Sequence, residues 1–374
     1  MENKIENLKS GLESLKNDNY KVYYFIPDTM GNPIASVANT YEHVKILREN
    51  GINAALLHEK TEYKFDGDDK GMGLSDWLGK EYAELPHFSV ERNEVNVGVG
   101  DFVIIPEIYS NVMESTANFP AKRIVFAQSY DYLLEILDYG KNWKDFGISD
   151  VITTSSVLSR HITELFGELN IKTIPCAISD KFTKSDIPKK PYIAIHTRGQ
   201  DKTAKIIKRF FLKYPQFRWV TFRDMRGLSV QEFADTLNEC CLAVWVDEVS
   251  SFGTFPLECF KTGTPIIGKI PDLIPDWLRG ADDTIKENGV WTNNILQIPD
   301  LINVVFKSWL EDNIPQEISK NMDESVKIYN TSLMKDVLLA YYSEIVKERQ
   351  VELSSLLSNE EKQQAVDLSG EVVS

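Results

Sequence analysis

Short apolar runs alternate along the chain with stretches in which apolar residues recur every three or four positions. A strand buried on both faces has a nearly continuous apolar run, and strands that alternate with helices favour a parallel sheet. The sequence therefore predicts an α/β protein built from doubly wound sheets. The expected strands are residues 21–27, 53–57, 101–106, 122–127, 150–156, 171–174, 192–197, 217–223, 242–246 and 264–268.

The length and the two ends of the chain predict its division into domains. At 374 residues the chain exceeds the usual size of a single hydrophobic core, so we expect two domains joined through residues 183–190. Apolar residues with helical spacing predict a short amphipathic helix within residues 1–19. Residues 351–374 are polar in composition and are expected to form a flexible tail.

The most informative stretch is residues 243–268, AVWVDEVSSFGTFPLECFKTGTPIIG. It predicts a buried strand, a loop of small polar residues, a helix that Pro256 can start and Gly263 ends, and a second strand. The loop and the helix start would lie at the carboxyl edge of a parallel sheet, where open α/β sheets bind ligands. Free amides at a helix start suit a phosphate. An ordinary βαβ unit with a tight turn would show the same spacing.

The order of residues in this stretch resembles the donor-sugar motif of GT-B-fold glycosyltransferases, the retaining group related to glycogen and sucrose synthases. The first glutamate of that motif is replaced by Ser250, and Glu248 lies two residues upstream. A second segment, residues 174–182, resembles the I-P-N-G-I-D-x-x-F block of the same group. The residues in register with the donor-sugar motif are Phe252, Gly253, Pro256, Glu258, Gly263, Pro265 and Ile266.

The resemblance implies a GT-B fold, in which two Rossmann-like doubly wound domains face each other across a cleft. Residues 20–184 would form the acceptor domain and residues 185–330 the donor domain, with a helix at 331–350 returning to the first domain. The implied reaction moves a sugar from a nucleotide-sugar donor to an unidentified acceptor without a metal. The group's chemistry is retaining, but the replacement of the first motif glutamate by Ser250 leaves retention or inversion open in this chain. The family usually has one further strand and helix before this motif in its second domain. The wall that would bind the nucleobase is therefore the part of the site where this chain departs most from the family.

The resemblance also assigns roles to individual residues. Arg198 and Lys202, with Lys205 as an alternative to Lys202, would grip the donor diphosphate during catalysis. Glu258 would accept hydrogen bonds from the ribose hydroxyls. Without the resemblance, the cations would be interpreted as solvated surface charges. The remaining expected site residues are Ser250, Gly253, Thr254 and Phe255 on the donor side, and Gly31, Gln128 and Asp131 on the acceptor side.

Composition excludes several classes of partner and cofactor. The formal net charge of -15 makes nucleic acid and anionic lipid poor partners. The four cysteines show no zinc-site or disulfide-framework spacing, no run is apolar enough to span a membrane, and the start lacks a signal-peptide pattern. We therefore expect a cytoplasmic protein. Asp66 and Asp68 lie in a polar stretch that lacks the later ligands of a calcium loop, so no metal is expected.

Two other functions remain open at this stage. A sugar-nucleotide 2-epimerase of the same fold would need carboxylates and a histidine in the cleft, and only His196 is expected near it. A non-catalytic GT-B subunit, which binds nucleotide or a partner transferase, fits the replacement of the first motif glutamate by Ser250. Whether the chain forms an oligomer also stays open.

Overall fold

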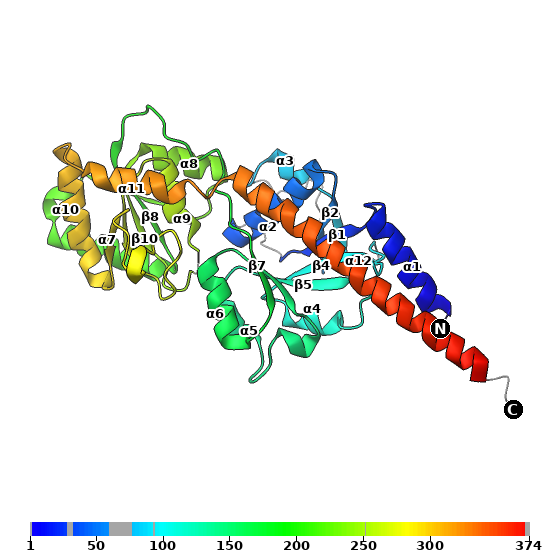
Figure 1. The fold of residues 1–374 in the computed structure, drawn as a ribbon. Coiled ribbons are helices and arrows are strands. Elements are labelled where there is room, and N and C mark those ends of the chain that lie inside the picture. Colours follow the sequence, from blue (N-terminus) through cyan, green and yellow to red (C-terminus); the bar gives the residue numbers. More distant parts are fainter. Residues whose placement is uncertain (1, 28–32, 60–76, 93, 251, 371–374) are drawn as a thin grey trace.

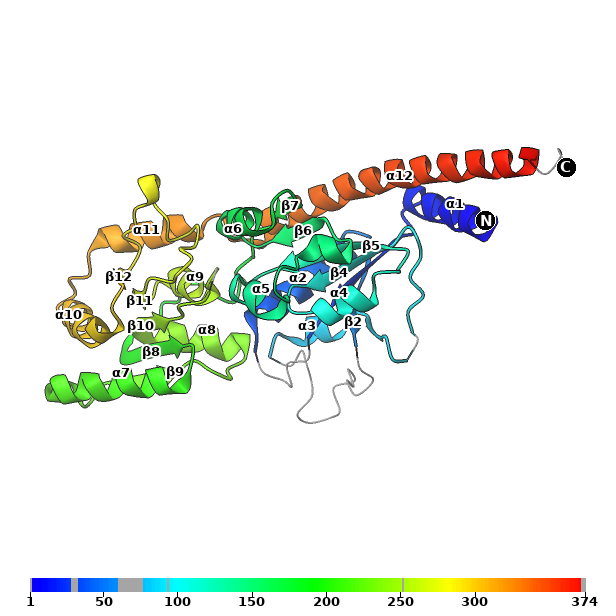
Figure 2. The ribbon, with the colours of Figure 1, turned by 90° about the horizontal axis from the view of Figure 1, so that it is seen from below.

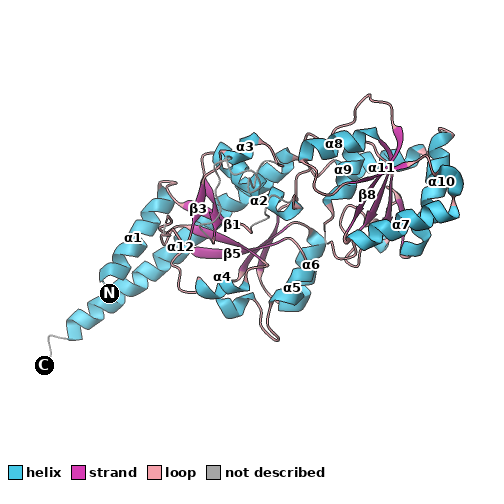
Figure 3. Ribbon diagram, turned by 180° about the vertical axis from the view of Figure 1, so that it is seen from behind, coloured by secondary structure: helices cyan, strands magenta, loops and turns pink. Residues whose placement is uncertain are grey.

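The structure is a computed structural model that describes residues 2–27, 33–59, 77–92, 94–250 and 252–370. It contains two parallel sheets with helices on both faces of each (Figure 1, Figure 3). The seven-stranded sheet has the order β3-β2-β1-β4-β5-β6-β7. Its strands are β1 Lys21–Phe25, β2 Asn53–His58, β3 His87–Ser89, β4 Phe102–Pro106, β5 Lys122–Ala127, β6 Asp150–Thr153 and β7 Asn170–Thr173.

The second sheet follows in sequence and has five strands in the order β12-β11-β10-β8-β9. Every strand pair described in either sheet is parallel. The predicted strand at 217–223 is shifted, because residues 215–217 form a short 3-10 turn and the strand starts at Thr221. The strands are β8 Lys190–Thr197, β9 Thr221–Asp224, β10 Cys240–Val246, β11 Ile266–Lys269 and β12 Val290–Thr292.

Helices cover both faces of each sheet and bury four hydrophobic clusters. Around the first sheet lie α1 Glu2–Lys16, α2 Ala35–Glu49, α3 Lys80–Ala83, α4 Ser110–Ser115, α5 Asp131–Ile136 and α6 Ser156–Phe166. Around the second lie α7 Gln200–Lys213, α8 Val230–Glu239, α9 Thr254–Lys261, α10 Ile298–Leu310 and α11 Gln316–Val326. We refer to the part built on β1–β7 as the first domain and to the part built on β8–β12 as the second.

The last helix, α12 Thr331–Gly370, starts beside the second domain and runs along the first (Figure 1, Figure 2). Its first half packs into the core of the first domain through residues such as Leu338 and Tyr342, both 0% exposed. The predicted flexible tail at 351–374 is wrong for residues 351–370, which continue this helix.

The C-terminal part of α12 is helical because it packs against α1. Leu353 is 0% exposed and lies in the same cluster as Leu8, Leu12 and Leu15 of α1. Two ion pairs also link the helices, and one of them joins Lys4 Nζ to a Glu360 carboxylate oxygen at 2.6 Å. The spacing of apolar residues therefore predicted the first helix correctly. The helix packs against the segment that was predicted to be a flexible tail.

Candidate active site

The structure contains the strand-loop-helix unit predicted from residues 243–268, and its strand, β10, is the central strand of the second sheet. All seven residues of β10 are buried, and the strand lies between β8 and β11. Gly253 caps α9 with a φ of +69°, and a Cβ on it would lie 2.8 Å from the Trp245 ring. Trp277 Nε1 donates a 2.5 Å hydrogen bond to the carbonyl oxygen of Phe252. These contacts fix the start of α9 at the carboxyl edge of the sheet.

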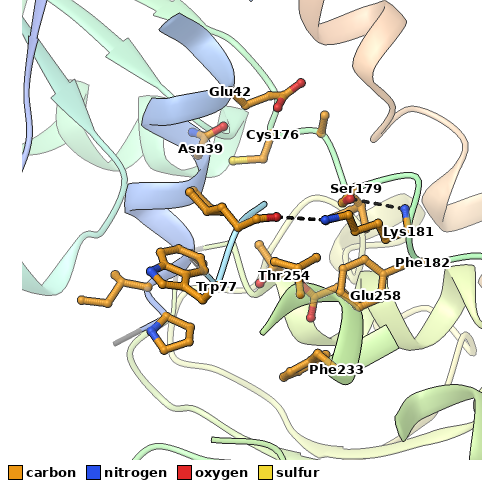
Figure 4. Close-up of a pocket in the computed structure, with 18 of the residues that line it drawn as sticks. Asn39, Glu42, Trp77, Cys176, Ser179, Lys181, Phe182, Phe233, Thr254 and Glu258 are labelled. Atoms are coloured by element: carbon orange, nitrogen blue, oxygen red, sulfur yellow. Dashed lines mark hydrogen bonds between the residues drawn. The ribbon is translucent and has the colours of Figure 1, made fainter. Parts of the chain in front are cut away.

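Glu258 lies on α9 and faces a cavity between the two domains (Figure 4). Burial raises the pKa of its carboxyl to about 8, although a hydrogen bond from the Thr254 side chain lowers it. The carboxyl is therefore mostly protonated at neutral pH when no ligand is bound. In that form it can donate one hydrogen bond and accept others, and a ligand that supplies donors can favour the ionised form.

The cavity has a volume of about 630 Å³, which lies within the range of small-molecule sites. Of the residues predicted from the sequence, Thr254, Phe255 and Glu258 line it. The second domain adds the loop at residues 225–228, between β9 and α8, and the first domain adds α2 and the residues just before α3. The cavity is therefore shared by the two domains.

Arg198 extends from the end of β8 towards the first domain and does not line this cavity. Its backbone N–H donates to the carbonyl oxygen of Val246 at 2.9 Å. Its guanidinium lies 3.9 Å from the carboxylate of Asp131, on α5, and 3.9 Å from that of Asp247, after β10. Both carboxylates are partly buried and the Arg198 side chain is exposed, and ion pairs this long contribute little to stability. Arg198 therefore bridges the domains and can exchange these carboxylates for another anion.

Lys202 lies in the first turn of α7 and is bound to Glu248. The distance from Lys202 Nζ to Glu248 Oε2 is 2.7 Å, and Lys269 Nζ lies 3.3 Å from the other oxygen. The hydrogen bonds from the two lysines hold the pKa of Glu248 below its usual range. Glu248 is therefore a counter-ion of Lys202 in this structure. Ser250, two residues further on, lies in the same loop and does not line the cavity either.

The three residues predicted on the acceptor side have different positions. Gln128 accepts a 2.9 Å hydrogen bond from Asn39 and donates one to the carbonyl oxygen of Ser36 at 3.1 Å, so it ties the end of β5 to α2. Asp131 is close to Arg198, as described above. Gly31 lies outside the described residues. Asp131 thus pairs across the domains with Arg198, one of the residues predicted to bind the diphosphate. Gln128 makes its hydrogen bonds within the first domain.

His196 and Trp77 are among the aromatic residues of the cavity that have no binding role predicted from the sequence. His196, at the end of β8, lines the cavity and stacks on Phe255 with ring centroids 5.1 Å apart. Burial lowers the pKa of His196 to about 4, so the ring is neutral. Trp77 also lines the cavity, from a region where the sequence shows no periodic pattern. The position of His196 before Arg198 was the signal that placed it near the cleft, whereas Trp77 had none.

The part of the chain that the structure describes contains neither a metal-binding cluster nor a membrane-spanning helix. Within it, no three His, Cys, Asp or Glu side chains are grouped as a metal ion would require. Asp66 and Asp68 lie outside the described residues. Among the described helices, none combines the length and the apolar character needed to cross a bilayer.

Comparisons with known proteins identify the fold. No family model matches the chain. The chain is 23% identical over 260 residues to an alpha-1,6-glucosyltransferase of Actinobacillus pleuropneumoniae serotype 7 (strain AP76). The matched region covers 65% of this chain and 74% of that protein. It is similar in structure to the pneumococcal O-GlcNAc transferase GtfA in complex with UDP and GlcNAc, with a TM-score of 0.60 and 10% identity over 88% of this chain and 99% of that one.

A second similar structure is sucrose-phosphate synthase from Thermosynechococcus elongatus, with a TM-score of 0.59 and 10% identity over 88% of this chain and 100% of that one. These findings confirm the predicted fold class, an α/β chain with two Rossmann-like domains in the GT-B arrangement. They also confirm the resemblance to glycosyltransferases of that fold.

Proposed function

We propose that this protein is a glycosyltransferase that moves a sugar from a nucleotide-sugar donor to an acceptor. The observation that carries the proposal is the cavity between two Rossmann-like domains, with the start of α9 and Glu258 in its wall. Open α/β sheets bind ligands at this edge. The glucosyltransferase relative and the UDP complex of the similar pneumococcal enzyme support a nucleotide sugar as the donor class.

In the proposed mechanism, Glu258 accepts hydrogen bonds from the ribose hydroxyls of the donor. Arg198, Lys202 and the amides at the start of α9 stabilise the negative charge that grows on the leaving diphosphate. Such stabilisation of developing charge is often the largest contribution to catalysis. Arg198 and Lys202 are now paired with carboxylates, so the diphosphate would replace these partners on binding. We further propose that no metal is needed, because two cations and free amides supply the positive charge.

The stereochemical course is proposed from the resemblance to the retaining group. In that chemistry the acceptor attacks from the same face that the diphosphate leaves, and the departing phosphate oxygen takes the acceptor proton. The sugar–phosphate bond breaks as the new glycosidic bond forms, and the products are the glycosylated acceptor and a nucleoside diphosphate. No separate protein base is then required.

A non-catalytic subunit that binds nucleotide is the second candidate. Ser250 replaces the motif glutamate that contacts the donor sugar in the family, and Glu248 is engaged by two lysines rather than free to replace it. A chain of this kind could bind the nucleotide and fail to position the sugar. The retention of Arg198 and Lys202 favours the enzyme, because their proposed role is in the transition state.

The experiment that tests the proposal is a calorimetric titration against a panel of nucleoside diphosphates and nucleotide sugars. We expect one nucleotide base to bind more tightly than the others, and its sugar conjugates to bind at the same site in competition. If no member of the panel binds to the folded protein, both candidate functions are wrong.

A further inference from the structure

The first domain contributes Trp77 and Leu78 to the wall of the cavity. We propose that Trp77, supported by Leu78, is the surface on which the nucleobase of the donor packs, so that nucleotide binding bridges the two domains. The inference rests on the proposed function and adds a specificity-determining residue to it.

Hydrogen bonds to two of its main-chain carbonyls fix this segment against the second domain and against the connection between the sheets. The Val230 N–H, at the first residue of α8, donates to the carbonyl oxygen of Trp77 at 2.9 Å. The first amides of a helix have no intrahelical partner, so this bond satisfies one that would otherwise need water. Lys181 Nζ, in the connection between the sheets, donates to the carbonyl oxygen of Leu78 at 2.9 Å. Because both acceptors are backbone carbonyls, changes to the Trp77 side chain leave these bonds in place.

The position of Trp77 relative to Glu258 identifies the ligand group that it meets. Figure 4 shows Trp77 and Glu258 on opposite sides of the cavity. Trp77 is bound to the helix that follows the loop at residues 225–228, which lines the same cavity. If Glu258 holds the ribose, a planar group attached to that ribose would extend between this loop and the indole.

The acceptor and the diphosphate fit this end of the cavity less well. Arg198 and Lys202 do not line it, and Arg198 is directed towards Asp131 of the first domain. The acceptor must reach the sugar carbon that is bonded to the diphosphate, so it belongs on the Arg198 side. That leaves the nucleobase as the part of the donor that reaches Trp77.

The magnitude of the effect follows from base stacking on aromatic side chains. Such stacking contributes about 1–3 kcal/mol per base, which corresponds to about a 5- to 150-fold change in affinity. Trp77 is 8% exposed, so one part of the indole faces the cavity and the rest packs in the core, with Val230 beside it. Trp77→Phe keeps an aromatic face at this position, and Trp77→Leu keeps an apolar side chain without one.

The test compares two probes, the best-binding nucleoside diphosphate and inorganic pyrophosphate, which lacks the base and the ribose. We expect Trp77→Leu to weaken the nucleoside diphosphate about 5- to 150-fold and to leave pyrophosphate unchanged. Trp77→Phe should lose only a small part of the affinity, and it should lose the change in tryptophan fluorescence that nucleotide causes in the wild type. Trp219→Leu is the control, because Trp219 is 53% exposed and does not line the cavity.

Three results would overturn the inference. Equal weakening of both probes would show that Trp77 acts through domain packing. An unchanged nucleoside diphosphate affinity in Trp77→Leu would show that the nucleobase does not pack on Trp77. If Trp77→Leu does not fold, Trp77→Phe provides the test. A nucleotide-dependent fluorescence change that is the same in Trp77→Phe as in the wild type would show that the nucleobase does not pack on Trp77. In each case the wild type still binds nucleotide, so the proposed function stands. Absence of nucleotide binding by the wild type would instead contradict the proposed function itself.

Discussion

The pKa of Glu258 predicts how nucleotide affinity depends on pH. In the free protein the carboxyl has a pKa of about 8, because it is buried. A ribose offers two hydroxyl donors, and an ionised carboxylate accepts from both without a competing proton of its own. If the carboxylate form binds ribose, binding releases a proton at any pH below about 8. Affinity should then rise with pH up to that value and level off above it.

The size of the effect follows from linkage. Each pH unit below the free pKa costs about tenfold in affinity, or about 1.4 kcal/mol, as long as the pKa in the complex lies lower still. At pH 6, two units below the pKa of Glu258, the wild type should bind about 50-fold more weakly than at pH 8, where the carboxyl is half ionised. The amide of Glu258→Gln does not ionise, so this variant lacks the part of the pH dependence of affinity that comes from position 258. At pH 8 the wild type should bind more tightly than Glu258→Gln by about 1–3 kcal/mol, and at pH 6 this advantage should disappear.

The assay is calorimetric titration of the nucleoside diphosphate at pH 6, 7 and 8 with both proteins. The terminal phosphate of the ligand also titrates near pH 6, and the variant measures that contribution alone. Two buffers with different ionisation enthalpies report the proton released per nucleotide. If the two proteins show the same pH dependence and release the same number of protons, then Glu258 does not bind ribose as a carboxylate.

Three further predictions concern other parts of the molecule. Arg198→Ala should reduce kcat far more than donor affinity, because charge on the diphosphate grows as the bond breaks; weaker donor affinity with kcat unchanged would assign Arg198 to uniform binding of the donor. Activity should survive a chelator, and a strict need for manganese or magnesium would contradict the metal-independent mechanism. Leu353→Ala should lower the free energy of unfolding by about 2–5 kcal/mol, because Leu353 is 0% exposed against α1. Leu356→Ala, at a 44% exposed position of the same helix, is the control in chemical denaturation, and equal losses would refute the packing of α12 on α1.

The elements that the sequence predicted best are those set by local residues. The strand before Asp247 is a continuous apolar run, and Gly253 and Gly263 mark the two ends of α9. Both glycines have positive φ, a conformation that other residues adopt at a cost. The order of these residues was enough to indicate the fold class before the structure was known.

The features that the sequence did not predict depend on contacts between distant residues. The segment after residue 350 is polar, and its helix is stabilised by pairing with α1, more than 300 positions away in the chain. Glu248 lies close to the motif position in sequence, but its lysine partners come from two other elements. Trp77 meets the second domain through a backbone carbonyl, which no side-chain pattern can reveal.

The central claim, that this protein transfers sugar from a nucleotide sugar, is tested most directly by its turnover. The measurement is release of nucleoside diphosphate from a broad panel of nucleotide sugars, with water as acceptor and again with cell extract as a source of acceptors. We predict slow but real release from one donor with water, faster release with extract, and loss of both in Arg198→Ala. If the nucleotide binds and no donor in the panel is consumed under either condition, the protein is a nucleotide-binding subunit and the claim is wrong.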